Sequence, residues 1–266
     1  ELVQPRVVDA EVVADLMDDG DADLLDHVLL CIADLAYRIA VDLDAVGKNC
    51  RVPVATFRQG DAGVQAEQVG LRRIVDDGVY FDMKPRFART IITCFARMDG
   101  RPVGIVASQP KHLGGILEID SADKAARFVN LCDAYGIPLL FLQDVPGFMV
   151  GTKVEHAGII RHGAKMLYAV SNATVPKITV IVRKAYGAGY YVMCGKAYEP
   201  DLIVAWPTAE ISVMGAEGAV NIIGRSVIEA ADDPDATRKA MEDAIRATID
   251  PYIAAGNAMI DDVIDP

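Results

Sequence analysis

The sequence has few aromatic residues and few histidines. Aromatics make up 6% of the 266 residues, and there are one tryptophan and four histidines. Aliphatic side chains must therefore build the core, and the 52% hydrophobic content is enough for one sizeable domain. The histidines show no HExxH or other metal-ligand spacing, so no metal site is predicted.

Cysteine is scarce and unpaired in its spacing. The five cysteines are Cys31, Cys50, Cys94, Cys132 and Cys194. They form no CxxC pair and no even framework that would indicate disulfides. We therefore expect reduced, buried thiols of an intracellular protein.

Excess basic charge and long hydrophobic runs are also missing. With 26 basic and 38 acidic residues the net charge is -12, which argues against a nucleic-acid partner. A few local cations and backbone N–H groups can still hold a small anion. No run approaches the roughly 20 apolar residues of a membrane span. No signal peptide follows Glu1, and a cytoplasmic location is expected.

The first 70 residues differ in texture from the rest of the chain. Apolar residues at helical spacing predict an amphipathic helix over Asp23–Val46, which packs on this domain or on a partner. Residues 51–70 lack a clean period and are predicted to form a connector. We therefore expect an unassigned N-terminal segment over 1–70 and one domain over 71–266.

The domain begins with a hairpin and a helix. Ile91–Ala107 is predicted to form two strands around Asp99-Gly100, a strong two-residue turn signal. Ser121 is predicted to cap a helix that runs to Tyr135, with Gly136 as its stop.

Apolar strands and helices alternate in the remainder. Buried strands are predicted at 138–142, 177–182, 202–205 and 211–213, and helices at 155–171, 217–223 and 235–248. The last helix ends before Pro251. This alternation is typical of an α/β fold with a mainly parallel sheet flanked by helices.

Three glycine turns follow apolar strands: Pro146-Gly147, Gly187-Ala188-Gly189 and Met214-Gly215. Glycine lets a ligand approach the backbone closely, and the first N–H groups of a following helix lack intrahelical partners. No GxGxxG, P-loop or GxSxG motif is present, so nucleotide fingerprints and a serine nucleophile are not indicated. A chemistry in which backbone donors stabilise an oxyanion fits better.

Six longer motifs stand out: FLQDVPGFMVGT (141–152), GIIRHGAK (158–165), ATVPKITV (173–180), RKAYGAGY (183–190), WPTAEISVMGAE (206–217) and DDVIDP (261–266). They resemble the carboxyltransferase β subunits of biotin-dependent acyl-CoA carboxylases, in particular the propionyl-, acetyl- and methylcrotonyl-CoA enzymes. They occur in the family's order over about 190 residues, from Ile74 to Pro266. The resemblance is to the second, biotin-side half of those subunits.

The resemblance implies a crotonase-like fold of stacked β-β-α units with backbone oxyanion holes. Ala188 and Gly189 then match the oxyanion hole that faces the ureido carbonyl of carboxybiotin. Five further residues match the walls of the biotin pocket: Gly147, Phe148, Gly187, Met214 and Gly215. Biotin on a carrier protein would be the cofactor, and acyl-CoA the substrate.

Tyr191 departs from the family pattern. Its position resembles one that tunes acyl-chain choice, where Asp or Ile is common. Together with Met193–Tyr198, Tyr191 favours methylcrotonyl- or longer-chain relatives over acetyl- and propionyl-CoA enzymes. Simple packing of the tyrosine is the alternative interpretation.

The family's first half, which binds acyl-CoA, has no counterpart in residues 1–70. In such enzymes the site lies between the first half of one subunit and the second half of another. The expected partners are therefore an acyl-CoA-binding half or subunit, a biotin carboxylase and a biotin carboxyl carrier protein, within a homo- or hetero-oligomer. The stop after Asp265-Pro266 favours a fragment of a longer subunit.

Four hypotheses stay open at this point. The first is carboxyl transfer to an acyl-CoA within a carboxylase, and the second is a biotin-dependent decarboxylase or transcarboxylase. The third is a non-catalytic structural half-subunit, which has little need for the glycine turn at 187–189. The fourth is a biotin-independent hydratase, which would need two catalytic carboxylates, for which Glu210 and Glu217 are the candidates.

Overall fold

The computed structural model describes residues 70–265. The predicted helix Asp23–Val46, the connector (apart from Gly70), Cys31 and Cys50 lie outside the described residues, and the domain boundary near residue 70 stays a prediction. Among the described residues, no helix combines the length and the apolar character needed to cross a bilayer.

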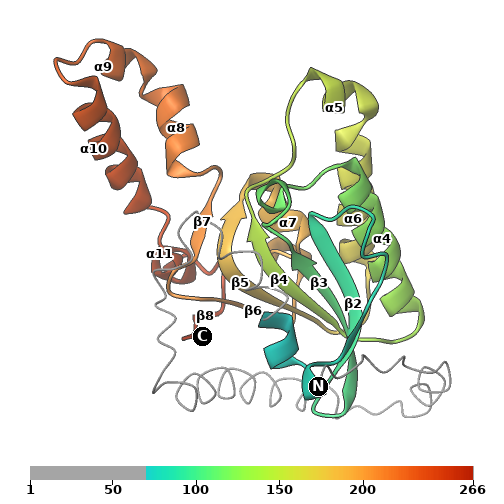
Figure 1. The fold of residues 1–266 in the computed structure, drawn as a ribbon. Coiled ribbons are helices and arrows are strands. Elements are labelled where there is room, and N and C mark those ends of the chain that lie inside the picture. Colours follow the sequence, from blue (N-terminus) through green and yellow to red (C-terminus); the bar gives the residue numbers. More distant parts are fainter. Residues whose placement is uncertain (1–69, 266) are drawn as a thin grey trace, which may run out of the picture.

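One sheet organises the described part of the chain (Figure 1). Its strands are β1 (Tyr80–Asp82), β2 (Ile91–Met98), β3 (Arg101–Ser108), β4 (Leu139–Val145), β5 (Lys177–Tyr186), β6 (Leu202–Ala205), β7 (Glu210–Ser212) and β8 (Asp262–Val263). The order along the sheet is β1-β2-β3-β4-β5-β6-β8, and β7 pairs with β5. The β1–β2 and β2–β3 pairs are antiparallel, and the other pairs are parallel. The predicted α/β class with a mainly parallel sheet is confirmed.

Helices connect the strands and cover the sheet. The α-helices are α4 (Ile119–Ala134), α5 (Thr152–Ala157), α6 (Ile159–Asn172), α7 (Gly187–Val192), α8 (Ala216–Ile223), α9 (Arg225–Glu229), α10 (Pro234–Arg246) and α11 (Pro251–Gly256). Short 3-10 turns occur at η3 (Asp76–Gly78), η4 (Leu113–Gly115) and η5 (Lys196–Tyr198). Helices α4 and α6 lie side by side against the sheet, whereas α8, α9 and α10 form an arm that projects away from it (Figure 1).

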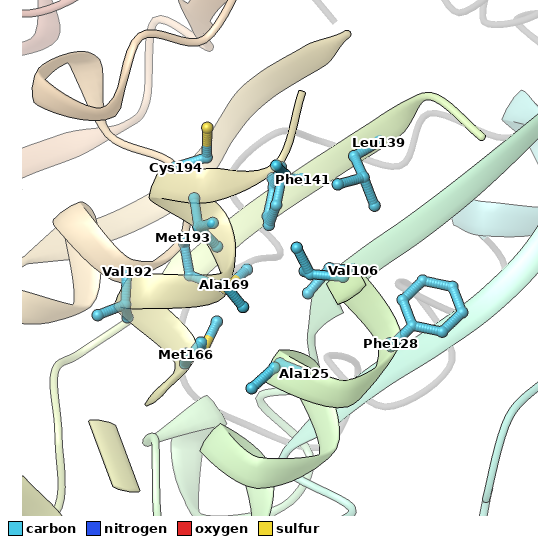
Figure 2. Close-up of a cluster of buried hydrophobic side chains, with 14 of the residues drawn as sticks. Val106, Ala125, Phe128, Leu139, Phe141, Met166, Ala169, Val192, Met193 and Cys194 are labelled. Carbon is cyan, nitrogen blue, oxygen red and sulfur yellow. The ribbon is translucent and has the colours of Figure 1, made fainter. Parts of the chain in front are cut away.

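The alternation of side chains along each strand creates two apolar layers. On β4, Leu139 and Phe141 face the layer beneath α4, α6 and α7, while Leu140 faces the opposite layer. Figure 2 shows the first layer, where Met166 of α6 and Phe128 of α4 pack with Val106 of β3. The sheet is thus covered on one face by the helices that carry or flank the glycine turns.

The predicted hairpin is confirmed. Asp99 and Gly100 both have positive φ, 54° and 78°, as a two-residue turn between twisted strands requires. Both backbone N–H groups of the turn donate to the carboxylate of Asp76, at 2.8 and 2.7 Å.

The prediction that Ser121 is the N-cap of this helix is wrong, although Ser121 takes part in its capping box. Glu118 is the N-cap, helix α4 begins at Ile119, and Ser121 is the third residue of its first turn. Its hydroxyl accepts from the Glu118 N–H at 2.8 Å and donates to the Glu118 carbonyl at 2.9 Å. The serine therefore stabilises the helix start from inside the first turn. Gly136, with φ 66°, ends the helix as predicted.

The predicted single helix over 155–171 is also wrong. Gly158 adopts φ 95°, a left-handed conformation that separates α5 from α6. In addition, β5 runs four residues beyond the predicted strand, since its end pairs with β7 and, past a register shift near Gln143, with β4. Strand β5 thus extends to the residue before the central glycine turn.

Three cysteines can be checked directly. Cys94, Cys132 and Cys194 are buried and carry free thiols, as predicted. Burial raises the pKa of the Cys94 and Cys132 thiols to about 12, and that of Cys194 to about 11. These thiols therefore serve as apolar packing groups at neutral pH.

Candidate functional site

The three glycine turns follow the carboxyl ends of neighbouring parallel strands. Gly147 follows β4, Gly187 follows β5, and Gly215 lies three residues after β7. Strand β5 pairs with both β4 and β7, so the turns meet at one edge of the sheet, beside α7 (Figure 1). Crevices outside the carboxyl ends of strands are where open α/β sheets bind ligands. We call Gly147, Gly187, Ala188, Gly189 and Gly215 the glycine site.

The backbone segments of this site lie so close to their neighbours that a side chain at Gly187 or Gly189 would clash. A Cβ added to Gly189 would lie 2.9 Å from Cγ2 of Val145 and 3.2 Å from Cα of Gly147. A Cβ on Gly187, which has φ 54°, would lie 2.9 Å from the carbonyl oxygen of Val213. The turns after β4, β5 and β7 thus contact one another directly.

Helix α7 presents its first turn at the centre of the site. Tyr186 is its N-cap, and Gly187, Ala188 and Gly189 are its first three residues. Their N–H groups belong to the set that has no acceptor within a helix. Ala188 is exposed, whereas Gly189 is buried. The first turn of α7 therefore has backbone N–H groups without an acceptor inside the helix, and its second residue, Ala188, is at the surface.

The other predicted pocket residues lie around this turn. Phe148 packs on α6, where a Cβ at Gly163 would lie 3.0 Å from its ring, and it pairs with Leu117 in an isolated bridge. Gly215 lies under the ring of Tyr186, with 3.0 Å from a built Cβ to Cε2. Met214, 36% exposed, follows the strand that pairs with β5. Phe148 directly follows Gly147 in the sequence, and Met214 directly precedes Gly215, so each places an apolar side chain next to a glycine turn.

Tyr191 lies on the same short helix and is 41% exposed. Its ring packs edge-on between Tyr190 and Tyr198, at centroid distances of 5.2 and 6.3 Å. The ring thus has both a packing surface and an accessible surface.

Gln143, which the sequence analysis missed, lies directly behind the turn. This side chain is fully buried, and its Nε2 donates to the carbonyl of Gly189 at 3.3 Å. Its Oε1 has no hydrogen-bond partner in the described part of the chain. Leaving a buried acceptor unpaired is costly, so this amide is an exception among buried polar groups. The only signal was a polar residue inside an apolar strand.

A buried ion pair below the site was also missed. Nε and Nη2 of Arg183 donate to Oδ2 of Asp144 at 2.9 and 2.6 Å, and the Lys184 N–H donates to Oδ1 at 3.2 Å. The Asp144 side chain is 5% exposed. Asp144 precedes Val145 and the Pro146 turn, so the pair ties the end of β4 to β5. Its role is to fix the two strands that carry the turns.

The two carboxylates of the hydratase hypothesis have different partners. Glu210 accepts a hydrogen bond from the Tyr186 hydroxyl, and burial together with this contact raises the pKa of that hydroxyl. Glu217 lies on α8 with its side chain 69% exposed and faces Arg246 at 3.6 Å. These contacts give the hydratase hypothesis no support. Within residues 70–265, no cluster of three metal-ligating side chains occurs.

Comparison with known proteins identifies the family. Residues 65–266 match the carboxyl transferase domain. The 12S subunit of methylmalonyl-CoA carboxyltransferase from Propionibacterium freudenreichii subsp. shermanii is 54% identical over 208 residues, which are 78% of this chain and 40% of that protein. The α subunit of methylmalonyl-CoA decarboxylase from Propionigenium modestum is 54% identical over 197 residues, 74% of this chain and 38% of that protein.

Solved structures agree. A transcarboxylase 12S crystal structure, a hexamer with methylmalonyl-CoA and methylmalonic acid bound, matches with a TM-score of 0.70 at 54% identity, over 75% of this chain and 38% of that one. The β subunit of geranyl-CoA carboxylase from P. aeruginosa matches with a TM-score of 0.68 at 33% identity, over 75% and 38%.

The chain spans about two fifths of the length of these relatives. Its architecture is that of the crotonase-like carboxyltransferases, which confirms the expected fold. The match covers most of the chain, including all three glycine turns. The chain therefore belongs to the carboxyl transferase domain family.

Proposed function

We propose that this chain is the biotin-side half of a carboxyltransferase, and that it acts within a biotin-dependent acyl-CoA carboxylase. The convergence of the three glycine turns around the first turn of α7 carries the proposal. Carboxyl transfer from a urea to a carbon atom needs no protein nucleophile, and the glycine site offers none. It offers main-chain donors in a fixed arrangement, which is the main requirement for stabilising a developing oxyanion.

The residues present fit a flat, bicyclic urea. Gly147 and Gly187 carry no side chain beside the exposed Ala188, and Phe148 and Met214 supply apolar surface next to them in the sequence. Carboxybiotin, when bound, supplies the carboxyl group that is transferred. The N–H groups of Ala188 and Gly189 would hold its ureido oxygen, and Gly147, Phe148, Gly187, Met214 and Gly215 would line its pocket. Asp144 and Gln143 hold the strand and the turn that carry these donors.

The acyl-CoA half of the site must come from elsewhere. Relatives of this chain are about two and a half times as long as the matched part, and one of them assembles as a hexamer. We therefore propose an acyl-CoA-binding half or subunit, a biotin carboxylase and a biotin carboxyl carrier protein as partners, in an oligomer. The cytoplasmic location stays a prediction.

A decarboxylase or transcarboxylase is the second candidate. Relatives named for decarboxylation and for transcarboxylation are as similar to this chain, at 54%, as relatives of the carboxylase type. Copurification separates the candidates, because a carboxylase brings a biotin carboxylase and a sodium-pumping decarboxylase brings a membrane subunit. A purely structural half-subunit is disfavoured by the glycine turn at 187–189, for which a scaffold has little need, and which places Ala188 at the surface.

Ala188→Pro tests the oxyanion role. Proline removes one donor N–H at a position in the first helical turn, where no intrahelical bond is lost. In the assembled enzyme we expect carboxyl transfer to fall about 100-fold or more, with an unchanged thermal midpoint. Ala188→Gly is the control, since it keeps the N–H and should retain most activity. Wild-type turnover in a folded Ala188→Pro variant would contradict the proposed oxyanion role.

Tyr191 is proposed to influence acyl-chain choice through the accessible part of its ring. Tyr191→Ile should change the ratio of kcat/KM between a short and a branched acyl-CoA. An unaltered ratio, with a lower melting temperature, would assign Tyr191 to packing against Tyr190 and Tyr198.

A further inference from the structure

A second concave surface lies outside the glycine site, between α4 and α6. It has a volume of about 700 Å³, and Lys84 and Phe87, after β1, complete its wall. Arg127 lines it from α4, and Arg161, Lys165 and Tyr168 line it from α6. We call it the α4/α6 groove.

The groove is cationic on an acidic chain. Among residues 70–265, five basic side chains line it, and Asp123 is the one carboxylate that does. Asp123 is already paired with His162 at 2.8 Å and with Lys165 at 3.1 Å. The groove therefore concentrates positive charge against the net charge of -12 of the whole protein.

Three of the basic groups have no carboxylate partner within residues 70–265: Lys84, Arg127 and Arg161. Lys84 lies 5.7 Å from the centroid of the Phe87 ring. The two arginines come from neighbouring helices, so their guanidinium groups can converge on one ligand. Guanidinium groups bind phosphate oxygens in a bidentate manner.

Contacts within the protein hold together the segments that form the walls of the groove. Lys124 is 4% exposed, and its Nζ donates to the carbonyls of Phe87 and Ile91 at 3.0 and 2.8 Å. This contact ties the segment after β1 to α4. Helices α4 and α6 are packed against each other along the groove (Figure 1). A preformed site loses little conformational freedom on binding.

Aromatic surface lies among the charges. Tyr168 is 70% exposed and Phe87 is 42% exposed, although both are large rings. Exposed aromatic faces beside cations suit a planar ring that carries phosphate groups, because stacking and charge pairing then act together.

We propose that the α4/α6 groove binds a phosphorylated ligand with a planar ring, such as a nucleotide. Arg127 and Arg161 hold the phosphate groups, Lys84 adds charge, and Tyr168, the more exposed of the two rings, stacks on the planar ring. This site goes beyond the proposed function, and only a coenzyme A thioester as its ligand would rest on that function. Two sources share this chemistry: the nucleotide end of a coenzyme A thioester, and a free nucleotide.

Calorimetric titration of the protein with adenosine 3′,5′-bisphosphate at low salt tests the site. We expect saturable binding at one site per chain. Arg127→Gln and Arg161→Gln should each raise Kd about tenfold or more, as expected for a charge-assisted contact. Arg225→Gln on α9 is the matched control: it removes the same charge from an exposed arginine whose partner is Glu229, and should leave Kd unchanged.

Two further measurements identify the class of ligand. Tyr168→Ala should weaken binding of the bisphosphate but not of inorganic pyrophosphate, which has no ring. Competition by coenzyme A indicates the thioester as the source, whereas binding of the bisphosphate without such competition indicates a free nucleotide. Absence of saturable binding, or equal weakening by Arg225→Gln, would overturn the proposal, since net charge alone would then explain the result.

Discussion

The glycine site and the α4/α6 groove use opposite kinds of chemistry. The glycine site is built from main-chain groups. Side chains contribute indirectly: glycine leaves space at the turns, and Gln143 and Asp144 anchor the neighbouring backbone and strand. The groove is built from long cationic side chains on two helices. The first should therefore be sensitive to added atoms, and the second to removed charges.

Gly189→Ala should give the largest effect. The new methyl group would meet Cγ2 of Val145 at 2.9 Å and Cα of Gly147 at 3.2 Å, so the turn must shift. We expect carboxyl transfer to fall about 100-fold or more, because donors of an oxyanion hole lose their value when they move. The measurement is kcat in the assembled enzyme.

Gly218→Ala is the control for this substitution. Gly218 lies in α8, and nothing lies within 4 Å of its added Cβ. Alanine is also the better helix former, so stability should rise slightly. Comparable loss of activity in both variants would show that the tight packing at Gly189 has no special role in transfer.

Several structural features of the fold and of the glycine site could be predicted from the sequence. The hairpin at Asp99-Gly100 and the strand at 202–205 were predicted correctly, because turn chemistry and apolar runs are local signals. The meeting of the glycine turns was also predictable, since each turn follows a parallel strand. The break of the 155–171 helix at Gly158 was not, because a helical period continues on both sides of a glycine that tertiary packing places at φ 95°.

The supporting contacts could not be predicted from spacing. Gln143 reaches Gly189 across 46 residues, and Asp144 reaches Arg183 across 39. The groove could not be predicted from the sequence for the same reason. Its basic residues Lys84, Arg127 and Arg161 are far apart in the sequence and share a surface only after α4 packs on α6. Long-range pairs of this kind depend on the register of the sheet rather than on local pattern.

The free energy of unfolding of Asp144→Asn, next to the glycine site, can be compared with that of Asp123→Asn, in the α4/α6 groove. Asp144 is 5% exposed and paired with Arg183, which is 26% exposed, so loss of its charge should lower the free energy of unfolding by about 2–4 kcal/mol. Asp123 is 32% exposed, and its loss should cost about 1 kcal/mol or less. Urea denaturation measures both. Equal costs would contradict the buried, strand-tying role of the Asp144 pair.

The smallest effect is the pH dependence that Asp123 confers. Partial burial opposes its ionisation, but hydrogen bonds from His162 and Lys165 outweigh burial and lower the pKa of its carboxyl. A lowered pKa stabilises the folded protein above the unfolded pKa of about 3.9, and this contribution is lost as pH falls through the folded pKa. The stability difference between the wild type and Asp123→Asn should therefore be larger at pH 7 than at pH 3. Lys165→Met should reduce that pH-dependent difference, because one of the two donors is gone. A difference that is the same at both pH values would show that the groove's single carboxylate is not held by its cations.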